Sequence, residues 1–216
     1  MTFPIRSQSR RRGISRRHAL GGLAAIVLLP FRAAAQPTLA PTPAQTEGPF
    51  YPRSLPADRD ADLTQVVGRA GRAQGVILYL SGRVLTREGQ PRPGTTIELW
   101  QCDARGRYHH VGDMREPRDD NFQGYGTTTT DAAGRYAFKT IRPVAYPGRP
   151  PHLHVKVHPA DTAALTTQIY IKGDITGGDA VLRSSPEGTL ERLSMVLAPA
   201  LGRESGALAG TFDFVV

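Results

Sequence analysis

Short stretches in which apolar and polar residues alternate recur along this chain of 216 residues. In an extended strand, successive side chains point to opposite faces, so alternation over about four to eight residues indicates a strand with one buried face. Turns rich in glycine and proline separate the stretches, and a helical pattern is confined to short pieces such as residues 185–193. Alternation or a short apolar run predicts strands at residues 76–85, 95–100, 127–130, 135–141, 152–157, 167–172 and 211–215.

Many short strands between turns predict an all-β fold, a two-sheet β-sandwich. Residues 45–216 have a suitable length for one domain with a substantial core. Residues 112–125 are rich in aspartate, arginine, glycine and asparagine, which predicts a long loop. Because binding residues are frequent on loops held by a rigid scaffold, this loop is a candidate wall of a pocket.

The first 35 residues have the composition of an export signal. They contain seven arginines and no acidic residue, an apolar run at residues 19–29, and three alanines at residues 33–35 that offer a cleavage site. The arginine pair at residues 16–17 resembles a twin-arginine signal, although Ala19 stands where that signal usually has phenylalanine. An ordinary secretion signal and an uncleaved anchor are the alternatives.

These features predict three segments. Residues 1–35 are expected to be a twin-arginine-type signal peptide, and residues 36–44, rich in proline, threonine and alanine, a flexible linker. Residues 45–216 are expected to form the catalytic β-sandwich domain. We therefore expect an exported protein, periplasmic or extracellular, that has no stable membrane insertion once the signal is removed.

The net charge of the chain, +8, comes mainly from the expected signal. Without the seven arginines of residues 1–35, the chain has 20 basic and 19 acidic residues, a net charge of +1. The expected mature protein therefore has no basic excess that would indicate a nucleic-acid partner or an acidic membrane surface. The single cysteine, Cys102, cannot form an internal disulfide and is expected to be a buried thiol rather than a metal ligand.

A group of candidate metal ligands lies around the predicted strand at residues 152–157. Because strand side chains alternate, His152 and His154 should project from the same face, where two imidazoles can bind a transition metal. The phenols of Tyr108 and Tyr146 could join such a site only after losing their protons, which requires a strongly acidic cation. Together the four side chains indicate ferric iron, Fe(III), in preference to copper or zinc.

Each of these residues has an ordinary structural interpretation as well. Lys156 and His158 continue the parity of the two histidines, so the strand could present a solvated polar face. Tyr146 could be a surface aromatic residue of a loop, Tyr108 a tyrosine at the edge of a strand, and Arg149 a solvated charge. Taken singly, these interpretations are favoured. The joint occurrence of the residues favours a metal site.

Several motifs in this order resemble those of the non-haem intradiol ring-cleavage dioxygenases, which act on catechol, hydroxyquinol or protocatechuate. The resemblance covers most of residues 45–216. The motifs that carry it are residues 46–51 (TEGPFY), 99–108 (LWQCDARGRY), 140–143 (TIRP) and 149–154 (RPPHLH), together with Gln168.

The resemblance implies an enzyme that uses Fe(III) and O2, without an organic cofactor, to open the ring of a catechol-type substrate between its two hydroxylated carbons. A muconate-type dicarboxylate would be the product. Tyr146 would leave the iron and carry a proton when substrate binds, and Arg149 would stabilise negative charge on the ring. Gln168 and Tyr51 would contact the substrate. The implied metal ligands are Tyr108, Tyr146, His152 and His154.

The chain departs from the best-known members of this family in two respects. Only residues 147–151 separate Tyr146 from His152, so one wall of the pocket should be short. An N-terminal helical segment of the kind used for dimerisation is missing from the pattern, and a homodimer is left open. The chain thus resembles an exported, short-loop branch, in which the identity of the catechol is undetermined.

A binding module is the alternative to an enzyme. The segments at residues 82–86, 96–99 and 130–136 also resemble those of secreted transthyretin-like β-sandwiches, which have similar strands and turns but no metal. A shared fold cannot separate the two functions, because function depends on the site. The joint presence of the four candidate ligands distinguishes them, since a non-catalytic sandwich has no need of this set.

Overall fold

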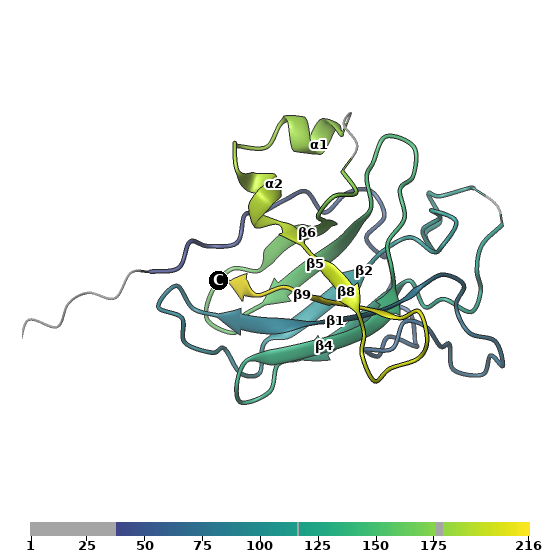
Figure 1. The fold of residues 1–216 in the computed structure, drawn as a ribbon, viewed down its shortest axis with the longest axis horizontal. Coiled ribbons are helices and arrows are strands. Elements are labelled where there is room, and N and C mark those ends of the chain that lie inside the picture. Colours follow the sequence, from purple (N-terminus) through teal and green to yellow (C-terminus); the bar gives the residue numbers. More distant parts are fainter. Residues whose placement is uncertain (1–37, 116, 176–178) are drawn as a thin grey trace, which may run out of the picture. The chain divides into compact units, whose positions relative to one another are not determined.

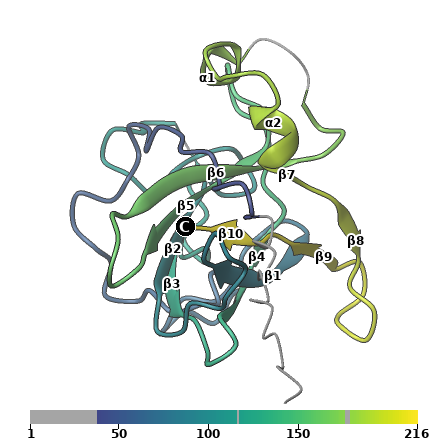
Figure 2. The ribbon, with the colours of Figure 1, turned by 90° about the vertical axis from the view of Figure 1, so that its left-hand side faces the viewer.

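The computed structural model describes residues 38–115, 117–175 and 179–216 and has the predicted all-β, two-sheet fold (Figures 1 and 2). The first sheet contains β1 (Ile77–Leu85), β4 (Arg135–Ile141), β8 (Leu197–Pro199), β9 (Leu208–Thr211) and β10 (Phe214–Val215). The second has the spatial order β3 (Tyr125–Thr129), β2 (Thr96–Trp100), β5 (His152–His158), β6 (Leu165–Ile171) and β7 (Ser194–Met195). Two one-turn helices, α1 (Ala180–Arg183) and α2 (Thr189–Arg192), precede β7.

Strand β1 is the centre of the first sheet. It pairs antiparallel with β4 and parallel with β9 and β10. In the second sheet, β2 pairs antiparallel with β3 and β5, β5 pairs antiparallel with β6, and β6 pairs parallel with β7. The strand at residues 211–215 is therefore two short strands. The break between β9 and β10 lies opposite Gly82 of β1. A Cβ atom at Gly82 would lie 1.8 Å from the Phe212 carbonyl oxygen, so only glycine allows the backbones of residues 82 and 212 to approach so closely.

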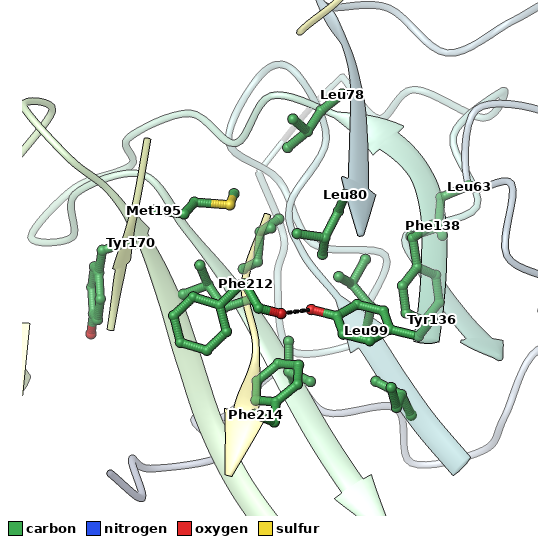
Figure 3. Packing of buried hydrophobic residues seen from close by; sticks show 14 of the residues in the cluster. Leu63, Leu78, Leu80, Leu99, Tyr136, Phe138, Tyr170, Met195, Phe212 and Phe214 are labelled. Carbon is green, nitrogen blue, oxygen red and sulfur yellow. Dashed lines mark hydrogen bonds between the residues drawn. The ribbon is translucent and has the colours of Figure 1, made fainter. Parts of the chain in front are cut away.

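The hydrophobic core lies between the sheets (Figure 3). Alternate residues of the first sheet, such as Leu78 and Leu80, face alternate residues of the second, such as Leu99. Each fully buried leucine side chain of this kind contributes about 2 kcal/mol. The buried Tyr136 hydroxyl has a hydrogen-bond partner, because it donates to the Phe212 carbonyl over 2.7 Å.

Strand pairing in the second sheet determines which side chains are neighbours on each of its two faces. Trp100 lies opposite His154, which in turn lies opposite Gln168. Residues one position away, such as Leu99 and Val155, pair in the same way and belong to the core. Because side chains alternate, Trp100, His154 and Gln168 all point away from the core, to the outer face of this sheet.

The described part of the expected linker is fixed to the sandwich. The Leu39 amide donates to the Arg87 carbonyl over 2.6 Å, and the Thr42 amide donates to the Val215 carbonyl over 2.9 Å. Its composition is typical of a linker, but composition does not reveal such backbone partners. The expected signal peptide lies outside the described residues. In the described part of the chain, no helix is long and apolar enough to cross a membrane.

Candidate active site

The outer face of the second sheet is covered at one end of β5. His152 and His154 are 1% and 2% exposed. Gly48 packs directly on His154, since a Cβ atom there would lie 3.3 Å from the imidazole Cε1 atom. Phe50 stacks on the Tyr108 ring with the centroids 4.7 Å apart. The two histidines therefore do not form a solvated polar face.

A turn directly after β2 brings Tyr108 to this place. The Asp103 amide donates to the Arg107 carbonyl over 2.8 Å, and Gly106 takes the positive φ of 80° that the turn requires. The Tyr108 amide then donates to the Asp113 carboxylate over 2.8 Å. The chain is thus anchored before Tyr108 by the turn and after it by Asp113. The Tyr108 side chain is buried and does not lie at an open strand edge.

A second tight turn places Tyr146 and Arg149 side by side. The Arg149 amide donates to the Tyr146 carbonyl over 2.9 Å. Pro147 and Gly148, with a φ of 82°, are the residue types that a type II turn favours at its two central positions. The Tyr146 ring lies edge-on to Tyr108 at a centroid distance of 5.7 Å, and 5.5 Å from the His152 ring.

The structure brings the four predicted ligands together. The Nε2 atoms of His152 and His154 are 3.1 Å apart, and the Tyr108 hydroxyl is 3.4 Å from Nε2 of His152. Neighbouring ligands that each bind one ion at about 2.0–2.1 Å have separations of this size. Among the residues that the structure describes, no group of three or more His, Cys, Asp or Glu side chains could hold a metal, so this site depends on its phenols.

Burial keeps all four side chains neutral in the absence of a cation. Burial lowers the pKa of His152 to about 4, and burial and the neighbouring His152 hold the pKa of His154 well below its ordinary value. Burial and the nearby Tyr146 raise the pKa of Tyr108 well above its ordinary value, and burial also raises the pKa of Tyr146. Two neutral imidazoles and two neutral phenols are thus available at neutral pH.

The histidine geometry suits metal binding. Nδ1 of His152 lies 2.7 Å from the Pro150 carbonyl oxygen, which can only accept a hydrogen bond. Nδ1 therefore carries the ring proton, and Nε2 presents its lone pair to the site. Nδ1 of His154 is buried without a hydrogen-bond partner among the described residues. The donor set fits a transition metal bound through both Nε2 atoms and both phenol oxygens.

Arg149 is bound to acidic and polar partners, not solvated. Its Nε donates to the Asp179 carboxylate over 3.0 Å, and its Nη2 donates to the Gln168 side-chain oxygen over 2.5 Å. The Asp179 side chain is only 2% exposed. Gln168 in turn donates to the Thr46 carbonyl over 2.9 Å. The predicted pair Arg149 and Gln168 thus forms one unit beside the donors, with Asp179 as an additional member.

Tyr51 is not part of the donor group. Its hydroxyl donates to the Glu98 carboxylate over 2.7 Å, and the Lys156 ammonium lies 4.0 Å from its ring centroid. Trp100 separates Tyr51 from the histidines, because it contacts Tyr51 edge-on and stacks on His154, each at a centroid distance of 5.0 Å. The structure gives Tyr51 a place in the cover of the sheet rather than at the four donors.

Several residues of the site were not singled out from the sequence. Trp100 supports His154, Asp113 anchors Tyr108, and Asp179 pairs with Arg149. The alternation of side chains along β2 could have indicated that Trp100 lies beside His154, but only if the pairing of β2 with β5 had been known. Asp113 and Asp179 lie in irregular segments, where sequence has no such periodicity. Cys102 is confirmed as a buried free thiol, and burial raises its pKa to about 12.

The fold and the four donors together define a class: a β-sandwich with two phenols and two imidazoles gathered on the outer face of one sheet. Comparisons with known proteins identify the family within this class. A family model described as Dioxygenase matches residues 46–216. The beta chain of protocatechuate 3,4-dioxygenase from Burkholderia cepacia is 37% identical over 167 residues, which are 73% of this chain and 71% of that protein.

Other relatives agree with this match. The hydroxyquinol 1,2-dioxygenase of Corynebacterium glutamicum is 33% identical, over 65% of this chain and 50% of that protein, so the chain spans half the length of this relative. The solved dioxygenase domain of a dioxygenase and carbohydrate-binding protein fusion from Streptomyces sp. SirexAA-E is 32% identical, with a TM-score of 0.64 over 82% of this chain and 98% of that domain. The chain belongs to the intradiol ring-cleavage dioxygenase family.

Proposed function

We propose that the chain holds one ferric ion through Tyr108, Tyr146, His152 and His154 and uses O2 to open a catechol-type ring between its two hydroxylated carbons. Both oxygen atoms would enter a muconate-type dicarboxylate. The observation that carries this proposal is the meeting of one buried and one half-buried phenol with two imidazole Nε2 atoms that are 3.1 Å apart. A non-catalytic β-sandwich binding module has no use for this arrangement.

The donor chemistry supports the ferric state. The raised pKa values of Tyr108 and Tyr146 mean that only a strongly acidic cation would convert both phenols to phenolates near neutral pH. Bound ferric iron supplies Lewis acidity, which lowers the pKa of a chelating diol and activates it for reaction with O2.

The two tyrosines differ in their anchoring, which supports different roles. Tyr108 is 2% exposed, stacks on Phe50 and is fixed by Asp113, so it would remain in place. Tyr146 is half-buried and lies on a turn whose Gly148 has no atom near its Cβ position. Tyr146 would be the ligand that moves, and its phenol oxygen would accept a proton from one hydroxyl of the incoming diol.

Arg149 is suited to stabilise negative charge on the reacting ring. Asp179 and Gln168 hold two of its nitrogen atoms, so its orientation is set before substrate arrives. Such fixed charges in a site with little water contribute about 3–4 kcal/mol when directed at a developing anion. Gln168 would act on the substrate mainly by fixing this guanidinium.

Oxygen uptake and product analysis test the reaction. With an iron-loaded chain and catechol, we expect equal consumption of O2 and catechol and a muconate product labelled by both atoms of 18O2. Arg149→Gln should lower kcat by at least about 100-fold, the effect typical of a lost electrostatic contact, while iron content is kept. Ring opening outside the two oxygenated carbons, or no uptake by a chain with one iron, contradicts the proposal.

Export is a separate part of this proposal. Its support is the arginine-rich and then apolar composition of residues 1–35. We expect the protein in the periplasmic or extracellular fraction, and we expect a double change of Arg16→Lys and Arg17→Lys to retain it in the cytoplasm. Equal export of both forms would rule out the twin-arginine route.

A further inference from the structure

An open hollow lies beside the two phenols. It has a volume of about 540 Å³, and its lining includes Phe50, Met114, Tyr146 and Pro147. Two of these rings, Phe50 and Tyr146, also contact Tyr108, at centroid distances of 4.7 and 5.7 Å. The hollow therefore adjoins the candidate active site, and Tyr146 belongs to both.

The size of the hollow exceeds the need of a one-ring diol. Pockets of about 300–1,000 Å³ usually take ligands of the size of a drug molecule. A catechol that presents its two oxygens to the four donors would fill only a part of this space. The hollow can therefore hold a substituent on the catechol ring, in contact with Met114 and Pro147, which are both exposed.

The charges around the hollow are compensated. Arg115, which lines it, donates from Nε to the Asp113 carboxylate over 2.8 Å and from Nη2 to the second oxygen of the same carboxylate. Arg149, deeper in the site, is paired with Asp179. Among the described lining residues, each cation thus has a carboxylate partner. A carboxylate on the substrate would find no unpaired cation here, whereas an apolar substituent would cover the rings of Phe50 and Tyr146.

We propose that the hollow takes an uncharged apolar substituent, alkyl or aryl, of a catechol whose diol reacts at the four donors. This inference rests on the proposed function and assigns its substrate class. Met114 is the specificity-determining residue, because its side chain is 83% exposed on the rim and has no packing role that would otherwise explain an apolar residue there. Carboxylated catechols such as protocatechuate are disfavoured by the same site.

Steady-state kinetics of the iron-loaded full chain test the substrate class. We expect kcat/KM for 4-phenylcatechol to exceed that for catechol by at least about tenfold, as the burial of a further ring predicts. Protocatechuate should lie below catechol. Equal values for catechol and 4-phenylcatechol, or a preference for protocatechuate, would overturn the inference while leaving ring cleavage intact.

Matched variants locate the effect. Met114→Asp should lower the ratio of kcat/KM for 4-phenylcatechol to that for catechol by at least about tenfold, because apolar burial on the rim is lost. Met114→Lys supplies an unpaired cation and should raise the relative kcat/KM for protocatechuate. Leu201→Asp, a change at a site that is 92% exposed and lies outside the hollow, is the control and should leave both ratios unchanged. Identical ratios in all three variants would contradict the role of Met114.

Calorimetric binding without O2 separates this inference from the proposed function. The iron-loaded chain should bind 4-phenylcatechol at least about tenfold more tightly than catechol, and Met114→Asp should abolish the difference. This outcome would support apolar substituent binding in the hollow even if no catechol is cleaved. In that case only the proposed ring-opening reaction would be contradicted. Equal affinities for the two ligands would overturn the inference whether or not the enzyme turns over.

Discussion

The two ends of β5 both place alternate side chains on the outer face of the sheet, but the surroundings of these side chains differ. At one end, His152 and His154 are 1% and 2% exposed and meet two phenols. At the other, the side chains of Lys156 and His158 are 16% and 38% exposed and pair with Glu47 and Glu98.

The cover over the strand causes this difference. Gly48 and Phe50 pack over the histidine end, together with Tyr108, and exclude water from it. The other end has acidic partners and contact with solvent. Strand periodicity thus determines which side chains share a face. Packing from distant segments determines whether a histidine on that face becomes a buried neutral donor or a partly exposed hydrogen-bond partner of a carboxylate.

The largest effect should come from removing a donor at the covered end. His154→Ala takes away one of four expected ligands and should weaken iron binding by more than the roughly 10–100-fold that loss of an outer-sphere partner typically costs. Iron content after dialysis, measured by elemental analysis on protein with an unchanged circular dichroism spectrum, checks this. A variant that keeps one iron per chain would remove His154 from the ligand set.

The covered end should also make the metal-free protein sensitive to acid. Because the pKa of His152 is about 4 in the folded protein and 6.5 ordinarily, the unfolded chain takes up a proton first as pH falls. Stability is therefore present above pH 6.5 and is lost as pH falls toward 4, by about 3 kcal/mol for this residue. Urea unfolding at several pH values measures this loss, and His152→Gln should reduce its slope. An identical slope would contradict the buried neutral state.

A change in the cover alone should have an intermediate effect. Gly48→Ala places a methyl group at a φ of 74° and 3.3 Å from the His154 ring. We expect a loss of about 1–2 kcal/mol of unfolding free energy from the backbone, together with weaker iron binding. Gly68→Ala is the matched control, since its φ is 81° but no atom lies within 4 Å. Equal iron affinity in the two variants would show that the cover does not hold His154.

The smallest effect is expected at the open end of β5. His158→Ala removes a partly exposed pair with Glu98, whose other oxygen still accepts from Tyr51. A hydrogen bond typically contributes about 0.5–1.5 kcal/mol net, so unfolding by urea should change little and iron content should stay at one per chain. Loss of iron similar to that of His154→Ala would erase the distinction between the two ends.

The sequence predicted the local features of this molecule well. Alternation located β1, β4 and β5, and His152 and His154 do share a face, as their spacing predicts. The strands β7 and β8 were not predicted, because segments of two or three residues are too short to have a period.

The partners of the site residues could not be predicted from the sequence. Asp113 and Asp179 are ordinary loop acids by sequence, and only the folded chain brings them to Tyr108 and Arg149. Tyr51 shows the same limit, because the sequence suggested substrate contact, which stays a prediction, but did not reveal that its hydroxyl donates to Glu98. Local patterns thus identified the donors, and long-range packing determined their surroundings.

Visible absorption of the iron-loaded chain tests the central claim most directly, namely that the phenol of Tyr108 is a ligand of ferric iron. Phenolate bound to ferric iron absorbs visible light through charge transfer, so the wild-type protein should be red to burgundy with one iron per chain. Tyr108→Phe, which removes only the phenol oxygen, should shift or abolish this band. An iron-loaded wild-type protein without colour, or a variant with an unchanged spectrum, would contradict the account.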